Sequence, residues 1–301
     1  MPKRIVSPLS GFGSPFGRRV RARFSEWFLA SGFWDNDGRW LDAVAWPLLD
    51  TPAPAFDPDA LAYIAAVETA DGEPLEAGVR EAINGFVVGC KADGIWDALK
   101  ASCILAGART LNGALVPLKG AAPTNFNFVS ADYNRTTGLK GDGATKYLNS
   151  NRNNNADPQN SSHLSVFSSE IGDGNRIAIG NNTASGGSQI LISTDFKLSL
   201  RLKGETFVGT ESTLQIEEGL TGASRNTSTE VNFRSGQISG SASNTSVTPS
   251  LGDIWLFWRS SETGLHSNAR LSFYSIGEAI DLAALDTRVS ALITALDGAL
   301  P

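Results

Sequence analysis

The sequence predicts a mainly β protein: an antiparallel β-sandwich of the jelly-roll type, preceded by a small helical segment and an extended N-terminal arm, and closed by a C-terminal helix. Beyond residue 106, apolar and polar residues alternate, as in Phe196 to Lys203, where one face is apolar and the other is Lys, Ser, Arg and Lys. Clusters of Gly, Asn, Ser and Thr separate such stretches, which is typical of turns between antiparallel strands. Apolar residues at helical spacing predict helices before and after this region.

Residues 1–56 form the predicted arm, which is rich in Gly, Pro and aromatic residues. Residues 1–25 carry six basic side chains and no acidic one, whereas residues 42–104 carry eleven acids and three bases. A basic, aromatic arm beside an acidic segment is typical of docking onto a partner. We expect these residues to anchor it: Lys3, Arg4, Phe12, Phe16, Arg18 and Arg19.

A helical linker domain of three helices is predicted for residues 57–106. Asp57 and Pro58 open the first, and Gly72 ends it. Apolar residues at steps of three and four predict a second helix ending near Cys90. The third is expected over residues 95–105.

The sandwich itself is predicted to span residues 107–278. Within it, the stretch from Gly138 to Asn155 ends in five asparagines among seven residues, which favours turns and predicts a long ordered loop with an exposed edge. The run Ile254-Trp-Leu-Phe-Trp258 predicts a central strand buried on both faces.

Residues 279–301 predict a helix with an apolar stripe of about two heptads. Two interpretations remain open: the helix packs on the sandwich, or the stripe is the seam of a homo-oligomer, for which we expect a trimer. The residues of the stripe are Leu282, Leu285, Val289, Leu292 and Leu296.

Composition excludes several classes of protein. A net charge of −6 argues against a nucleic-acid binder, which needs a basic face to neutralise phosphates. No stretch approaches the ~20 apolar residues of a membrane span, so we expect a soluble chain made in the cytoplasm. Cys90 and Cys103 lie in apolar surroundings and are expected to be buried thiols.

The sequence offers little catalytic chemistry. A glycosidase needs two carboxylates a few ångströms apart, and no pair of acids alternates along the predicted strands. The two histidines, His163 and His266, show no metal-ligand spacing. We therefore predict no enzyme and no cofactor. Calcium is a weaker hypothesis, with Asp142 and Asp157 as candidate ligands beside Asn149 and Asn151.

Asn-rich loops with aromatic residues can bind sugars, because amides hydrogen-bond to hydroxyl groups and a ring stacks on the pyranose. The alternative is solvated turns with no ligand. The candidate sugar-binding residues are Tyr133, Arg135, Tyr147, Asn149, Arg152 and His163.

Several short motifs resemble a family of tailed-bacteriophage and prophage structural proteins that carry a concanavalin-like (laminin-G-type) jelly roll. The motifs are Ile95-Trp-Asp-Ala-Leu-Lys100, Gly107-Ala-Arg-Thr-Leu111, Pro117-Leu-Lys-Gly120, Thr124-Asn-Phe-Asn-Phe128, Asp132-Tyr-Asn-Arg135, Gly138 to Tyr147 and Phe273-Tyr-Ser-Ile-Gly277. The opening Arg4-Ile-Val-Ser-Pro-Leu9 is similar to the start of many such phage proteins.

This resemblance implies a virion component: a fibre, spike or decoration protein located on the head or the tail. Its partners would be other virion proteins and further copies of itself, and its sandwich would recognise a polysaccharide on the host surface. Neither nucleic acid nor membrane is an expected partner. A purely architectural protein without a ligand and a glycan depolymerase remain as alternatives.

Overall fold

The computed structural model describes residues 56–174, 176–181, 184–192, 197–208, 217–259 and 264–301, together with two short strands of the arm. Those strands, β1 (Gly32–Trp34) and β2 (Trp40–Asp42), pair antiparallel. Contacts divide the chain after Ala55, and Phe56–Pro301 is one compact unit. The residues expected to anchor the arm, Lys3, Arg4, Phe12, Phe16, Arg18 and Arg19, lie outside the described part.

Two antiparallel sheets form the sandwich, which confirms the predicted mainly β fold class. The first sheet has the order β11-β10-β9-β15-β7-β4. Its strands are β4 (Thr124–Phe126), β7 (Tyr147–Asn153), β9 (Arg176–Gly180), β10 (Ser188–Ile192), β11 (Leu198–Leu202) and β15 (Asp253–Leu256).

The second sheet has the order β14-β13-β12-β8-β16-β6-β5, and β3 also pairs with β16. Its strands are β3 (Leu99–Ile104), β5 (Tyr133–Asn134), β6 (Gly138–Lys140), β8 (Ser162–Glu170), β12 (Gly219–Arg225), β13 (Glu230–Ser235), β14 (Ile238–Ser243) and β16 (Arg270–Gly277).

Alternation along the strands builds the core between the two sheets. Leu148, Leu164, Ile179 and Ile190 point inward and are at most 1% exposed. Removing each such side chain from water contributes roughly 1.5 to 3 kcal/mol, so this apolar layer is the main source of the sandwich's stability.

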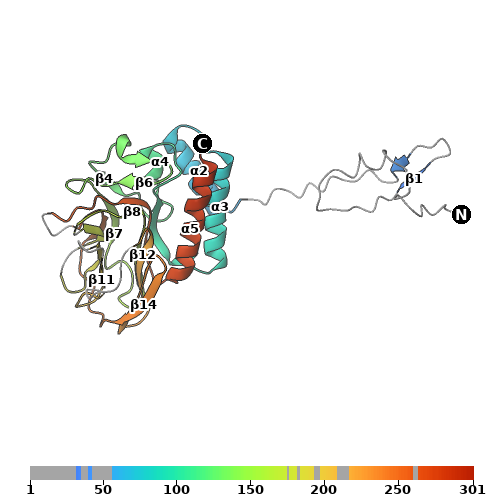
Figure 1. The fold of residues 1–301 in the computed structure, drawn as a ribbon. Helices are drawn as coiled ribbons and strands as arrows, with labels where there is room; N and C mark the ends of the chain where they lie inside the picture. The colour runs from blue at the N-terminus through green and yellow to red at the C-terminus, as the bar shows by residue number, and fades with distance from the viewer. Residues whose placement is uncertain are drawn as a thin grey trace. The chain divides into compact units, whose positions relative to one another are not determined.

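Three helices cover the outer face of the second sheet (Figure 1): α2 (Pro58–Asp71), α3 (Ala77–Ala92) and α5 (Leu282–Ala299). The start and end predicted for the first helix are confirmed: the Asp57 side chain accepts from the backbone N–H of Asp59, and Gly72 ends the helix with φ of 75°. Phe86 of α3 meets Phe273 of β16 edge-on, with ring centroids 5.7 Å apart. The helices therefore share a second core with the sheet. Three shorter turns complete the described helical elements: η1 (Trp96–Ala98), α4 (Leu111–Ala114) and η2 (Ser130–Asp132).

The predicted third helix is wrong. Residues 99–104 form β3, which pairs with β16 from Leu99↔Gly277 to Ile104↔Phe273. Five of its six residues are buried. A short apolar run buried on both faces has no polar stripe, so its periodicity cannot separate helix from strand.

Two predictions within the sandwich are also wrong. The Asn-rich stretch is not all loop, because Tyr147–Asn153 is β7, paired with both β4 and β15. The run from Ile254 is not buried on both faces, because Trp255 points outward and is partly exposed. In β7, neighbouring strands satisfy the backbone hydrogen bonds, and this outweighs the preference of asparagine for turns.

The apolar stripe of α5 packs within the chain, against α3 and β12. Leu285, Val289, Leu292 and Leu296 are at most 2% exposed, and Leu282 is 7% exposed. The stripe is therefore not available as a trimer seam. Among the described helices, none is long and apolar enough to cross a membrane.

Candidate functional site

An aromatic stack stands on the outer face of the six-stranded sheet. Phe126 of β4 lies 4.4 Å from Tyr147 of β7 between ring centroids, with 12° between the ring planes. Tyr147 lies 4.8 Å from Trp255 of β15, at 8°. All three side chains are partly exposed. Phe126 and Trp255 are themselves 6.5 Å apart between ring centroids, at 19°, so the three rings pack as one near-parallel group.

A second aromatic pair supports the stack. Trp258 lies 4.4 Å from His266 at 15°, and its ring is tilted against Trp255 and Tyr147, with centroids 5.2 and 5.0 Å away. The indole N–H of Trp258 donates to the carbonyl of Gly264 at 3.0 Å. Burial lowers the pKa of His266, which favours its neutral form. The five rings therefore form one fixed cluster.

Polar residues continue this row across the sheet, and Gln189 and Arg201 at its far end are only 1% and 3% exposed. Next to the stack, Asn149 Nδ2 donates to Asp253 Oδ2 at 3.0 Å. Gly180 of β9 is the register partner of Trp255, and the Cβ of Gln189 lies 2.6 Å from where a Cβ at Gly180 would stand. The paired residues of the row, from β4 to β11, are Thr124, Asn149, Trp255, Gly180, Gln189 and Arg201.

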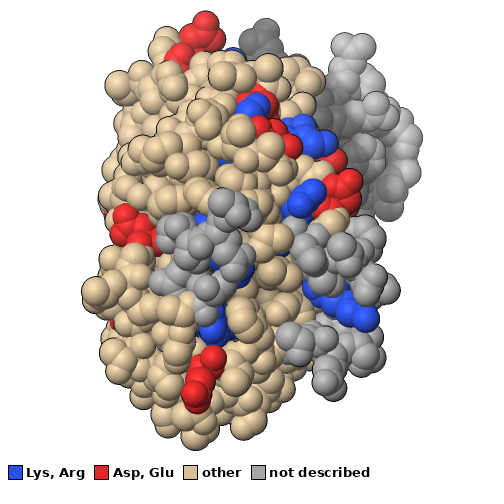
Figure 2. Space-filling view, turned by 90° about the vertical axis from the view of Figure 1, so that its left-hand side faces the viewer, with Lys and Arg blue, Asp and Glu red and all other residues tan. Residues whose placement is uncertain are grey.

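Basic groups gather at the β10 and β11 end of this row. Arg259 donates to Gln189 Oε1, and Arg201 lies over the ring of Phe207 at 4.3 Å. Burial, and then the nearby charge of Arg259, lower the pKa of Arg201. Figure 2 shows Lys and Arg side chains on this side of the molecule, within a surface that is mostly uncharged.

The structure does not bring the six predicted sugar-binding residues together. Tyr147 and Asn149 share the aromatic face. Arg152 lies on the same strand, but its guanidinium makes a two-pronged ion pair with Asp157, with Nε 2.9 Å from Oδ2. The positive charge of Arg152 is therefore neutralised by Asp157 within the chain.

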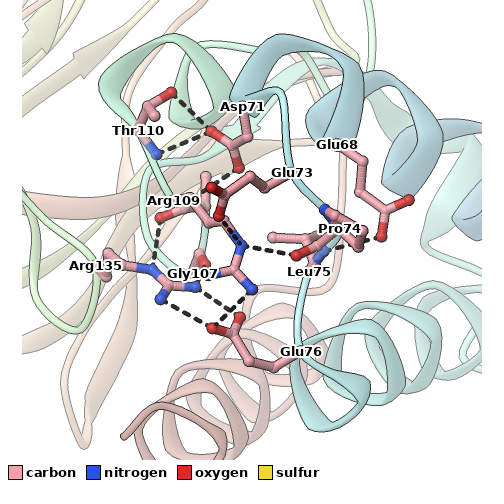
Figure 3. A network of polar contacts seen from close by, with 11 residues as sticks. Glu68, Asp71, Glu73, Pro74, Leu75, Glu76, Gly107, Arg109, Thr110 and Arg135 are labelled. Atoms are coloured by element: carbon pink, nitrogen blue, oxygen red, sulfur yellow. Dashed lines mark hydrogen bonds and ion pairs between the residues drawn. The ribbon is translucent and has the colours of Figure 1, made fainter.

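Tyr133 and Arg135 belong to a joint between the helices and the sandwich, and Figure 3 shows the contacts of Arg135. The hydroxyl group of Tyr133 donates to the carbonyl of Ala108 at 2.7 Å. Arg135 donates to both carboxylate oxygens of Glu76 and to the carbonyl of Gly107, at 3.1, 2.7 and 3.1 Å. These bonds lower the pKa of Glu76, which stays ionised.

The same joint contains Asp71. Its carboxylate accepts from the backbone N–H groups of Arg109 and Thr110 at 2.7 and 2.8 Å, and from the Thr110 hydroxyl at 2.7 Å (Figure 3). Two of the motifs that carry the family resemblance, residues 107–111 and 132–135, therefore have a structural role here.

His163 is fully enclosed, at 1% exposure. Its Nδ1 donates to the carbonyl of Glu278 at 2.5 Å, and its Nε2 lies 2.9 Å from the hydroxyl of Ser275. Burial lowers its pKa to about 4, so the ring is neutral at pH 7. This geometry places His163 inside the protein, away from Tyr147.

The two calcium candidates are also engaged. Asp142 caps its own turn, accepting from the backbone N–H groups of Ala144, Thr145 and Lys146 at 2.9, 2.8 and 3.0 Å, which together with the Thr145 hydroxyl lower its pKa despite partial burial. Asp157 pairs with Arg152. Across the described residues, no group of three or more His, Cys, Asp and Glu side chains could hold a metal ion.

Sequence reasoning missed Phe126, Trp255, Trp258 and His266 as members of the cluster. One signal was present: Trp255 alternates with Ile254 and Leu256, which places the indole on the opposite face from the core. The stack itself joins residues more than 100 positions apart, and only the strand order reveals it.

No family model matches the chain, and no curated protein matches it in sequence. Solved structures resemble its fold. The botulinum neurotoxin serotype D binding domain is 12% identical, with a TM-score of 0.45, and the match covers 65% of this chain and 51% of that chain. The Trypanosoma rangeli sialidase in complex with 2-keto-3-deoxy-D-glycero-D-galacto-2,3-difluoro-nononic acid is 9% identical, with a TM-score of 0.41, covering 66% and 33%. The receptor binding domain of botulinum neurotoxin mosaic serotype C/D is 12% identical, with a TM-score of 0.42, covering 65% and 50%.

The chain therefore spans about half the length of the toxin domains and a third of that of the sialidase.

Proposed function

We propose that the outer face of the six-stranded sheet binds carbohydrate, and that the chain is the glycan-binding part of a virion attachment protein of the fibre or spike type. The aromatic stack of Phe126, Tyr147 and Trp255 on a partly exposed sheet face is the observation that supports binding. The virion role rests on the sequence resemblance. In this proposal the arm attaches the chain to other virion proteins, and copies of the chain act together.

The chemistry of the stack suits a sugar. The C–H face of a pyranose packs against an aromatic face, and the partly exposed rings of Phe126, Tyr147 and Trp255 offer such a surface. Beside it, the carboxylate of Asp253 accepts one bond from Asn149 and keeps further lone pairs for sugar hydroxyls. Contacts of this size give weak binding at each site, and several linked copies on one particle raise the overall affinity through effective concentration.

An array of bacterial surface polysaccharide fragments tests this proposal, followed by calorimetry on the glycan that binds. We expect Trp255→Ala to weaken binding roughly fivefold or more, because loss of an aromatic contact costs on the order of 1 kcal/mol. Val129→Ala is the matched control, since Val129 is 57% exposed and lies outside the cluster. Equal affinity of a folded Trp255→Ala variant and the unmodified chain would refute the proposed surface.

A second candidate is an architectural protein without a ligand. Asparagines of the Asn-rich stretch bond within the chain: Asn151 Nδ2 donates to the carbonyl of Ala122 at 2.7 Å, and Asn154, 1% exposed, donates to the carbonyls of Gly186 and Ser250 at 2.9 and 3.0 Å. Cryo-electron microscopy of the particle separates the two candidates. A six-stranded sheet facing outward supports recognition, and one covered by other subunits supports architecture.

A further inference from the structure

A groove of about 680 Å³ lies on the other sheet, beside the first turn of α5. Strands β12, β13 and β14 form its floor, and residues 279–283 form its wall. None of its lining residues belongs to the aromatic cluster, and the groove opens on the outer face of a different sheet.

The floor of the groove carries short hydroxyl and amide side chains. Ser224, Asn232 and Ser241 are register partners across the three strands, and Ser239 lies opposite Arg234 in the next row. Phe233 and Gly240 lie between these rows, and Ile280 and Leu282 line the wall, so the groove offers both hydrogen-bonding and apolar surface. Asn232 offers an amide donor and acceptor, and Ser239 and Ser241 each offer both from one hydroxyl group, whereas the buried Ser224 hydroxyl accepts from the backbone N–H of Ile280.

The charges in the groove are largely compensated. Arg234 forms an ion pair with Asp286 of α5, with Nε 2.7 Å and Nη2 2.6 Å from Oδ2. Asp281 caps α5, its Oδ1 accepting from the backbone N–H groups of Ala283 and Ala284 at 2.8 and 3.2 Å. Its second carboxylate oxygen is an additional acceptor at the wall. This donor and acceptor set suits a neutral polar ligand better than an anion.

Three hydrogen bonds hold the wall and the residue before it in place. His163 Nδ1 donates to the carbonyl of Glu278 at 2.5 Å, Ala279 N donates to Ser161 Oγ at 3.1 Å, and Ile280 N donates to Ser224 Oγ at 3.0 Å. The wall is therefore formed before any ligand arrives, which reduces the entropy lost on binding.

We propose that this groove is a second saccharide site, which holds one or two neutral sugar residues by hydrogen bonds to Asn232, Ser241 and Asp281. Each sugar hydroxyl both donates and accepts, which matches a surface of amide, hydroxyl and carboxylate groups. The volume lies within the ~300 to 1,000 Å³ of small-ligand sites. The site does not depend on the aromatic face.

Transverse-relaxation-optimised NMR of the full chain tests this site. The probes are glucose, galactose, mannose, N-acetylglucosamine and rhamnose, each titrated to about 100 mM, since single sugars held by a few hydrogen bonds have millimolar affinity. At least one probe is expected to give saturable shifts at the backbone amides of Asn232, Ser241 and residues 280–283. If none of the five does so, the proposal is wrong.

Variants separate the groove from the aromatic surface. Asn232→Ala is expected to weaken the groove titration at least fivefold, whereas Trp255→Ala leaves it unchanged. Asp281→Asn is a second probe in case Asn232→Ala disturbs the strand, since asparagine still caps the helix but has lost the carboxylate. Shifts confined to the backbone amides of β14 would indicate strand addition at the sheet edge and would overturn the proposal. Loss of the groove shifts in Trp255→Ala would do the same.

Discussion

Arg135 and Glu76 form a two-pronged ion pair, with Nη1 3.1 Å from Oε1 and Nη2 2.7 Å from Oε2. The pair joins the residue that follows β5 of the sandwich to the N-cap of α3, 59 residues earlier in the chain. Because the Arg135 side chain also donates to two backbone carbonyls, all its bonding groups serve the joint between helices and sheet. Helical segment and sandwich are therefore expected to unfold together.

Arg135→Ala is expected to lower the free energy of unfolding by about 2 kcal/mol, since it removes charge-assisted hydrogen bonds in a partly buried site. Arg135→Lys should recover part of this loss, because lysine keeps the charge but not the two-pronged geometry. Urea unfolding followed by circular dichroism measures both variants. If Arg135→Ala keeps full stability but loses sugar binding, Arg135 is a ligand residue after all.

Leu292→Asp is expected to prevent folding rather than to dissociate an oligomer. Leu292 is 2% exposed in the core that α5 shares with α3. An unpaired carboxylate there costs several kcal/mol. Thr287→Asp, on the exposed side of the same helix, should fold normally. Circular dichroism measures whether the variant folds, and light scattering measures its mass. A folded Leu292→Asp chain of reduced mass would support the interpretation of the α5 stripe as an oligomer seam.

The buried Lys203 predicts a stability change at alkaline pH. Its Nζ donates to the carbonyl of Asp157 at 2.7 Å, and burial lowers its pKa to about 8 from 10.5. Between these two values the unfolded chain binds more protons than the folded one, so the contribution of Lys203 to stability rises with pH. We expect the unfolding free energy of the wild type minus that of Lys203→Met to rise by on the order of 2 to 3 kcal/mol from pH 8 to 10.5. A flat difference would contradict the lowered pKa.

His163 predicts a change of stability in acid. Its pKa is about 4 in the folded chain and 6.5 when exposed. As pH falls through this window the unfolded chain takes up the proton first, so the stabilisation that is complete above pH 6.5 is lost by up to about 3 kcal/mol near pH 4. Thermal unfolding of the wild type and His163→Gln across this range should show a smaller slope for the variant. Parallel curves would mean that another group causes the acid loss.

Gly138 and Gly143 form a matched pair for testing the Gly-rich turns. Both have positive φ, 95° and 72°. A Cβ at Gly138 would lie 2.2 Å from the carbonyl oxygen of Leu271, whereas a Cβ at Gly143 would have no neighbour closer than 3.5 Å. We expect Gly143→Ala to cost roughly 1 kcal/mol, as strain alone does, and Gly138→Ala to cost more than that. Equal costs, measured by urea unfolding, would mean that β16 shifts to make room.

The fold class was predictable because local patterns determine it. Alternation identified the strands, and Asp57, Pro58 and Gly72 marked both ends of a helix through backbone chemistry that acts within a few residues. The strand of residues 99–104 was not predictable, because burial on both faces comes from a sheet on one side and helices on the other. Similarly, β7 forms only because β4 and β15 lie beside it.

The candidate site was only partly predictable. Tyr147 was identified from its sequence neighbours, but its stacking partners Phe126 and Trp255 come from strands that meet it only in the folded sheet. Arg135 and His163 carried the right chemistry for a ligand, yet their partners Glu76 and Glu278 lie 59 and 115 residues away. Pairings over such separations leave no local signal.

The helices cover one sheet, so the two sides of the unit differ in how freely they can vary. Outward residues of the six-stranded sheet such as Thr124, Tyr147 and Asn149 lie outside the fully buried core, whereas α5 and β16 contribute to it along their whole length. Substitutions on the aromatic side are therefore expected to change the proposed binding surface with little effect on folding. Within a population of relatives that meet different surfaces, diversity should accumulate there while the helix-covered side remains constant.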